Sequence, residues 1–136
     1  MDESLAQEVR QRADHACEYC RMPQALYPTV PFPIDHVIAR QHGGPTVLSN
    51  LALSCLHCNS HKGPNIAGLD RQTKKLTKLF NPRRHQWQRH FRWDGPYLVA
   101  RTAVGRVTIA VLALNAAEVI EVRHALIEEG LFPPPG

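Results

Sequence analysis

The spacing of apolar positions predicts helices and short strands in the first half of the chain. Leu5, Val9 and Ala13 recur every four residues, which places them on one face of a helix over about residues 3–13. Residues 32–38 (FPIDHVI) read as a short strand, whereas residues 51–55 (LALSC) fit either a strand or a helical turn. A further helix is expected to open at Cys58 and to stop near Gly63, or to continue with an interruption to about residue 69.

The second half of the chain predicts a β-hairpin followed by a helix. Residues 97–114 (YLVARTAVGRVTIAVLAL) are typical of a hairpin that turns near Val104 and Gly105. Residues 115–130 predict a helix with a capping-box-like pair, Asn115 and Glu118, and a terminating Gly130. The apolar face of this helix would consist of Val119, Val122 and Leu126.

Length and composition indicate one globular domain. The 136 residues allow a modest core, and no apolar run is long enough to span a bilayer, so we expect no membrane partner. The N-terminal segment is acidic and polar and does not resemble a secretory signal. We therefore expect a cytoplasmic protein with reduced thiols.

The net charge of +4 conceals a concentrated basic segment. Residues 71–93 hold eight of the 16 Lys and Arg residues and no acidic residue, so all the excess positive charge lies there. A dense cationic stretch attracts polyanions and favours a nucleic acid as partner. The alternative is an ordinary solvated face whose aromatic residues pack on the core. The two interpretations are compatible, and we expect the aromatic residues to lie mostly in the core and the cations mostly to face nucleic acid.

The four cysteines form two Cys-x-x-Cys pairs, Cys17 with Cys20 and Cys55 with Cys58. Two such knuckles can give four thiolates to one tetrahedral zinc ion. A redox pair would need a βαβ context, and disulfides fit poorly with reduced thiols, so structural zinc is the favoured interpretation. A site with four thiolate ligands would stabilise the fold rather than perform chemistry. It would also bring the two ends of residues 21–54 together, so that this segment forms a closed loop.

Several motifs in and around residues 21–54 together resemble the HNH endonuclease family. They are the Asp35–His36 pair, Gly43–Gly44, the run N-L-x-L-x-C-x-x-C-N-x-x-K-G over residues 50–63, and the earlier Cys-x-x-Cys pair. The resemblance covers about residues 15–64 and points to the subgroup braced by a four-cysteine zinc. It implies a ββα-metal nuclease core, and with the β-hairpin and helix expected from the pattern of the second half the fold class is α+β. We expect residues 1–70 to form the core and residues 71–136 to pack on it.

The resemblance implies a catalytic role for four residues of this chain. His36 would be the general base that activates water, a reaction suited to an imidazole near neutral pH. Asp35, on the opposite side of the strand, and Asn59 would hold one catalytic Mg²⁺ or Mn²⁺. Asn50 would fix the loop that aims His36. The family name expects His where this chain has Asn59; His61 is the alternative ligand, but a helix turns residues 59 and 61 about 200° apart.

The expected function is hydrolysis of phosphodiester bonds in DNA, with double-stranded DNA as the partner. The resemblance implies products with 5′-phosphate and 3′-hydroxyl ends. The residues expected to contact nucleic acid are Arg40, Lys62, Lys74, Lys75, Lys78, Arg83, Arg84, Arg89 and Arg92, although Arg40 and Lys62 could equally be solvent-facing cations. The main alternative is a zinc-stabilised nucleic-acid-binding module without catalysis, which would not need the set of Asp35, His36, Asn50 and Asn59. An RNA nuclease or a protein-interaction adaptor has no positive feature in the sequence.

Overall fold

The predicted N-terminal helix is present as α1, Glu3–Arg12, in the computed structural model, which describes residues 1–134. The Asp2 side chain accepts a hydrogen bond from the backbone N–H of Ser4 and caps the helix. Val9 is fully buried, and α1 packs on the segment around residue 50. The Arg12 guanidinium donates to the carbonyls of Leu48 at 2.8 Å and Leu51 at 2.6 Å, which fixes α1 on that segment.

A small ββα unit follows. Strand β1, Ile34–His36, pairs antiparallel with β2, Leu51–Leu53, so residues 51–53 form a strand rather than a helical turn. Helix α2, Leu56–Lys62, begins three residues after β2, with Cys55 as its N-cap. Three short 3₁₀ helices lie in the loops: η1 at Gln24–Leu26, η2 at Arg40–His42 and η3 at Leu48–Asn50. Helix α2 thus begins at the second cysteine pair and follows the strand that pairs with β1.

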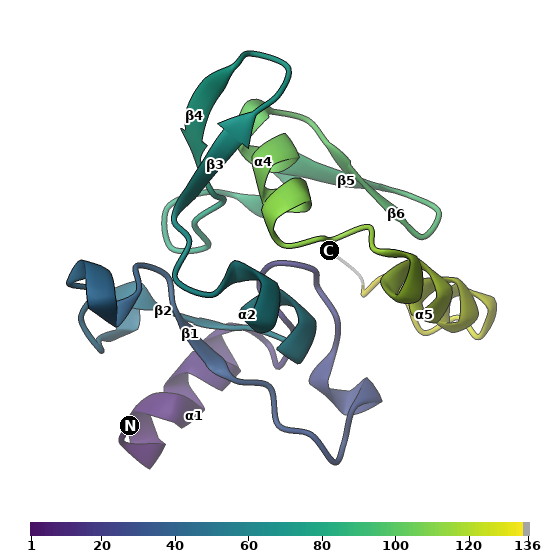
Figure 1. Cartoon of the computed structure of the whole chain (residues 1–136). Coiled ribbons are helices and arrows are strands. Elements are labelled where there is room, and N and C mark those ends of the chain that lie inside the picture. Colours follow the sequence, from purple (N-terminus) through teal and green to yellow (C-terminus); the bar gives the residue numbers. More distant parts are fainter. Residues whose placement is uncertain (135–136) are drawn as a thin grey trace.

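The remaining residues form two hairpins and three helices. The first hairpin pairs β3, Ala67–Asp70, with β4, Lys75–Lys78. The second pairs β5, Phe91–Asp94, with β6, Tyr97–Ala100, directly after the short helix α3, Trp87–His90. Helix α4, Ala103–Val111, packs against both hairpins, and α5, Ala117–Glu128, lies at one side of the molecule (Figure 1). The predicted boundary at residues 70 and 71 falls in the turn of the first hairpin.

The predictions about the local structure of later segments are only partly correct. Residues 97–114 do not form one hairpin, because Thr102 caps a helix by accepting a hydrogen bond from Gly105 N–H, and apolar residues 104, 107 and 111 follow the helical period. Of the two ends considered for the helix after the second cysteine pair, the stop near Gly63 is confirmed, because α2 ends at Lys62 and β3 begins at Ala67, although the helix begins at Leu56 rather than at Cys58. Asn115 does not cap α5; its amide group bonds to both backbone polar groups of Leu98. On α5 the most buried residue is Arg123, whereas Val122 is exposed.

The aromatic residues of the basic segment belong to the core, as predicted. Phe80, Trp87 and Phe91 are buried, and Trp93 packs partly buried on Trp87 and Phe132. They join the ββα unit to the second half of the chain, because Trp87 Nε1 donates to the Tyr19 carbonyl at 2.8 Å. Among the helices of residues 1–134, none combines the length and apolar character needed to cross a bilayer.

Candidate active site and metal centres

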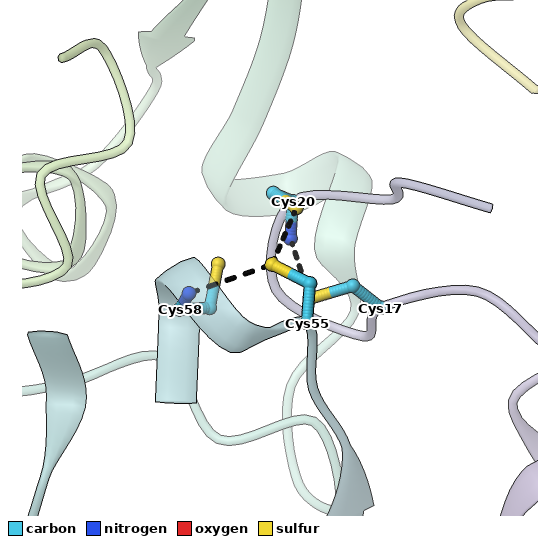
Figure 2. A group of neighbouring side chains, drawn as sticks. All are labelled: Cys17, Cys20, Cys55 and Cys58. Carbon is cyan, nitrogen blue, oxygen red and sulfur yellow. Dashed lines mark hydrogen bonds between the residues drawn. The ribbon is translucent and has the colours of Figure 1, made fainter. Parts of the chain in front are cut away.

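The four cysteines converge in one buried cluster, although 34 residues separate the two pairs (Figure 2). Their sulfur atoms all lie within 4.8 Å of one another, and Cys20 Sγ is 3.6 Å from Cys55 Sγ. None of the four forms a disulfide. In each pair the backbone N–H of the second cysteine points at the sulfur of the first, at 3.5 Å for Cys20 to Cys17 and 3.4 Å for Cys58 to Cys55. The cluster has the arrangement of two knuckles that face one centre.

Asp35 and His36 lie on opposite sides of β1, as the alternation of a strand requires. Asp35 points inward and is only 5% exposed. The His36 ring is half-buried, with its Nε2 atom 2.8 Å from Thr46 Oγ1. The structure gives no hydrogen bond to His36 Nδ1 within residues 1–134. The ring is therefore anchored through one nitrogen and has the other available.

Two side chains hold the Asp35 carboxylate. Tyr19 Oη donates to Oδ2 at 2.7 Å, and Lys62 Nζ lies 3.1 Å from Oδ2 and 3.3 Å from Oδ1. Burial raises the pKa of Asp35, and the Lys62 charge opposes this rise. The same ammonium group donates to the carbonyls of His36 at 3.3 Å and Val37 at 3.0 Å. Lys62 thus fastens α2 to the end of β1.

The loop after β1 is fixed by Asn50, which is buried. Its Oδ1 accepts from Ile38 N–H at 2.9 Å, and its Nδ2 donates to the carbonyls of Ile38 at 3.1 Å and Pro45 at 2.9 Å. Gly44 lies so close to this bridge that a Cβ atom there would be 1.7 Å from the Ile38 oxygen. Because Thr46 follows Pro45 directly, Asn50 also sets the position of the residue that contacts His36.

A protein-family comparison matches the model described as HNH endonuclease to residues 17–65, which include both cysteine pairs, β1, β2 and α2. Residues 17–65 form an HNH endonuclease domain. Endonucleases cleave phosphodiester bonds, and the matched residues make up a little over a third of the chain. Comparisons with curated proteins and with solved structures gave no match.

Asn59 and His61 lie on different faces of α2 in the HNH domain. Asn59 precedes Lys62 by three residues, so the two share a helical face, and Lys62 contacts Asp35. His61 instead stacks on His57, with ring centroids 4.1 Å apart, and its Nδ1 is 2.8 Å from the His57 carbonyl. Asn59 is therefore on the helical face of Lys62, the residue that contacts Asp35.

The oxygen donors of Asp35 and Asn59 suit a hard cation such as Mg²⁺ or Mn²⁺. Asp35 Oδ1 accepts only the Lys62 contact, and a carboxylate oxygen has a second lone pair. Within residues 1–134 the side-chain amide of Asn59 makes no hydrogen bond. Both groups thus keep capacity for a further ligand, with Lys62 as a neighbouring positive charge.

The cysteine cluster fits zinc by its geometry. With a Zn–S distance of about 2.3 Å, the sulfurs of a tetrahedral site lie about 3.8 Å apart, close to the observed contact of Cys20 with Cys55. Hydrogen bonds from the other three thiols lower the pKa of Cys55, and hydrogen bonding within the cluster raises the pKa of Cys20 and Cys58. A zinc ion at the centre of the cluster would stabilise the thiolate form of its four ligands.

A buried arginine of α5 neighbours this cluster. Arg123 is fully buried, lines a cavity of about 450 Å³ together with Cys20 and Cys55, and has its guanidinium 5.1 Å from the centre of the Trp93 ring. It donates to the carbonyls of Pro96 at 3.0 Å and Leu114 at 2.6 Å. Burial lowers the pKa of Arg123, and the negative charge of the cysteine cluster opposes this. Arg123 thus places one positive charge beside a tetrathiolate site.

Two residues expected to contact nucleic acid are instead engaged by acidic partners within the protein, Lys62 buried and Arg83 partly buried. Lys62 is 1% exposed and occupied by Asp35, so it is neither a phosphate contact nor a solvent-facing cation. Arg83 is paired with Glu18, which also accepts a hydrogen bond from Leu53 N–H at 2.8 Å, and its side chain is 13% exposed. The other expected contacts are exposed: Arg40, Lys74, Lys75, Lys78, Arg84, Arg89 and Arg92.

A groove of about 600 Å³ lies between the end of β1 and the first hairpin. Val37 and Ile38 line one side of it, Leu76 and Lys78 of β4 line another, and Arg84 lies nearby. None of its lining residues is acidic. The groove is thus continuous with the residues that follow His36.

Sequence reasoning missed Tyr19, Thr46 and Arg123. Tyr19 lies between two cysteines, Thr46 follows the Gly–Gly loop, and Arg123 stands on a helix predicted to be amphipathic. Nothing in the local pattern around these residues indicates a role. Only the folded contacts with Asp35, His36 and the cysteine cluster do.

Proposed function

We propose that this protein is a metal-dependent DNA endonuclease with His36 as its general base. The observation that carries the proposal is the arrangement at the end of β1. There the His36 ring is anchored through Nε2 to Thr46, the preceding residue Asp35 carries a carboxylate with a free lone pair on the other side of the strand, and a groove without acidic residues begins at Val37.

The anchored ring supports a specific direction of proton transfer. If Nε2 carries the hydrogen and donates to Thr46, Nδ1 has the lone pair that can accept a proton from water. The Asn50 bridge holds the intervening loop, so the ring does not have to be ordered when substrate binds. His36 thus acts on water, and Thr46 and Asn50 orient it.

Asp35 and Asn59 would hold one Mg²⁺ or Mn²⁺ ion. When bound, such an ion stabilises negative charge on the phosphate and on the leaving 3′ oxygen. The products would carry 5′-phosphate and 3′-hydroxyl ends, as the family resemblance implies. The four-cysteine cluster would hold zinc, with Arg123 offsetting part of its negative charge.

The groove beside β1 is the proposed path of the DNA backbone. Lys78 and Arg84 line it, and Lys74 and Lys75 are exposed at the turn of the first hairpin and the start of β4. Exposed cations of this kind bind phosphates and provide affinity without base specificity. Lys62 closes the floor of the groove, because its ammonium group is bound to β1.

The proposal is tested by incubating supercoiled plasmid with zinc-loaded protein in the presence of Mg²⁺, Mn²⁺ or no added divalent ion. We expect nicking only with added ion. Asn59→Ala is expected to remove nicking at low ion concentration, whereas His61→Ala, two positions away on another helical face, is expected to retain it.

Each alternative outcome is informative. Loss of activity in His61→Ala but not in Asn59→Ala would show that the second ligand is misassigned. Plasmid binding without nicking in every ion would instead support a zinc-stabilised binding module.

A further inference from the structure

Tyr19 connects the cysteine cluster to the inward face of β1. It lies between Cys17 and Cys20 and is 1% exposed. Its carbonyl accepts the Trp87 indole N–H at 2.8 Å, and its ring packs edge-on against Phe80 at 6.4 Å between centroids. The side chain is therefore fixed along its whole length, from the knuckle to the hydroxyl.

Among residues 1–134 the Tyr19 hydroxyl has one hydrogen-bond partner, the Asp35 carboxylate, at 2.7 Å from Oδ2. The tyrosine hydroxyl is a neutral donor, and the carboxylate oxygen accepts its hydrogen. The bond occupies Oδ2 and leaves Oδ1 with Lys62 alone. The rotation of the carboxylate is thereby restricted, with Oδ1 as the oxygen open to a cation.

Tyr19 and Lys62 hold the same carboxylate in different ways. Lys62 brings a positive charge, which repels an incoming cation, whereas Tyr19 is neutral. A neutral donor can orient a carboxylate ligand without competing electrostatically with the metal, and outer-shell donors commonly have this role. The Tyr19 hydroxyl is thus the contact suited to a metal ligand.

We propose that Tyr19 is a positioning residue for the catalytic cation. Tyr19 is held by the cysteine knuckle, and its hydroxyl orients the Asp35 carboxylate that would bind the cation. This inference rests on the proposed function, because Asp35 must be a cation ligand for it to hold. Tyr19 itself does not touch the cation or the substrate.

The test is direct binding of Mn²⁺ to zinc-loaded protein, measured from the loss of the electron paramagnetic resonance signal of free Mn²⁺. Four proteins are compared: the natural sequence, Tyr19→Phe, Asp35→Asn, and Tyr97→Phe as a control at an exposed tyrosine of β6. Tyr19→Phe removes only the hydroxyl. We expect it to weaken Mn²⁺ binding about 10-fold or more with an unchanged zinc content, Asp35→Asn to abolish binding, and Tyr97→Phe to match the natural sequence.

The outcomes separate this inference from the proposed function. Unchanged Mn²⁺ affinity in Tyr19→Phe, together with loss in Asp35→Asn, would overturn the positioning role and leave the cation site intact. Equal Mn²⁺ binding by the natural sequence and Asp35→Asn would contradict the cation site itself, and the inference with it. Loss of zinc by Tyr19→Phe would assign the hydroxyl to the fold and would also overturn the proposal.

Discussion

The loop between β1 and Thr46 depends on Gly44, and the neighbouring Gly43 provides a matched control. In Gly44→Ala, the new Cβ would lie 1.7 Å from the Ile38 oxygen and 2.9 Å from Asn50 Nδ2. An ordinary contact needs about 3.5 Å, so the loop must open by roughly 1.5–2 Å. The three Asn50 hydrogen bonds, now 2.9–3.1 Å long, cannot survive such a shift.

The expected cost follows from these bonds. Each buried hydrogen bond contributes about 1 kcal/mol, so Gly44→Ala should lower the free energy of unfolding by about 3 kcal/mol. Gly43 has φ of +86° but open space around it, so Gly43→Ala should cost only the strain of a left-handed alanine, about 1 kcal/mol. Urea unfolding at saturating zinc, followed by tryptophan fluorescence, measures both values.

The same pair of variants tests the link between the loop and catalysis. Because Thr46 would move with the opened loop, folded Gly44→Ala protein should nick plasmid more slowly than Gly43→Ala. Stabilities within about 0.5 kcal/mol of each other would show that the Asn50 bridge does not hold the loop, and the reasoning about His36 orientation would fail.

Three further predictions concern charged residues. Lys62→Met should lower the free energy of unfolding by about 3–5 kcal/mol in urea titrations, because Asp35 would be left buried without its cation; a loss below about 1 kcal/mol would contradict the buried pair. Arg106 and Thr73 hold the pKa of Asp70 below its usual range, so this contribution to stability is present above the unfolded pKa of about 3.9 and is lost as the pH falls through the lower folded pKa. The melting temperature should therefore fall more between pH 5 and pH 3 in the natural sequence than in Asp70→Asn, and parallel curves would refute this. Arg84→Ala should weaken DNA binding and reduce the slope of log binding constant against log salt concentration by about one. Arg83→Ala should instead mainly lower the melting temperature, because Arg83 is paired with Glu18. The reverse pattern in binding titrations would show that the basic surface is misassigned.

The parts of the site that can be predicted from local sequence are the motifs whose residues lie close together along the chain. The Cys-x-x-Cys pairs, the Asp35–His36 strand end and Asn50 carry signals of this kind, and the structure brings the four cysteines together. The N-terminal helix was predictable because its apolar period is strong and Asp2 caps it.

The sequence could not predict partners that are distant along the chain. Arg83 pairs with Glu18, 65 positions away, and Lys62 with Asp35, 27 positions away. A lysine or arginine in a basic segment is typical of a solvated surface, so burial by an acidic partner has no local signal. Helix α4 was missed because its valines and isoleucine favour strands, whereas the Thr102 cap and the packing between two hairpins favour a helix.

The measurement that tests the central claim most directly compares His36→Ala with the natural sequence in single-turnover nicking of supercoiled plasmid, at saturating Mg²⁺ and with both proteins zinc-loaded. Binding of the same DNA is measured separately without added divalent ion. If His36 is the general base, the variant should nick more slowly by roughly 10²-fold or more while its DNA affinity is unchanged. Equal nicking rates would contradict the assignment of His36 and the proposed mechanism with it.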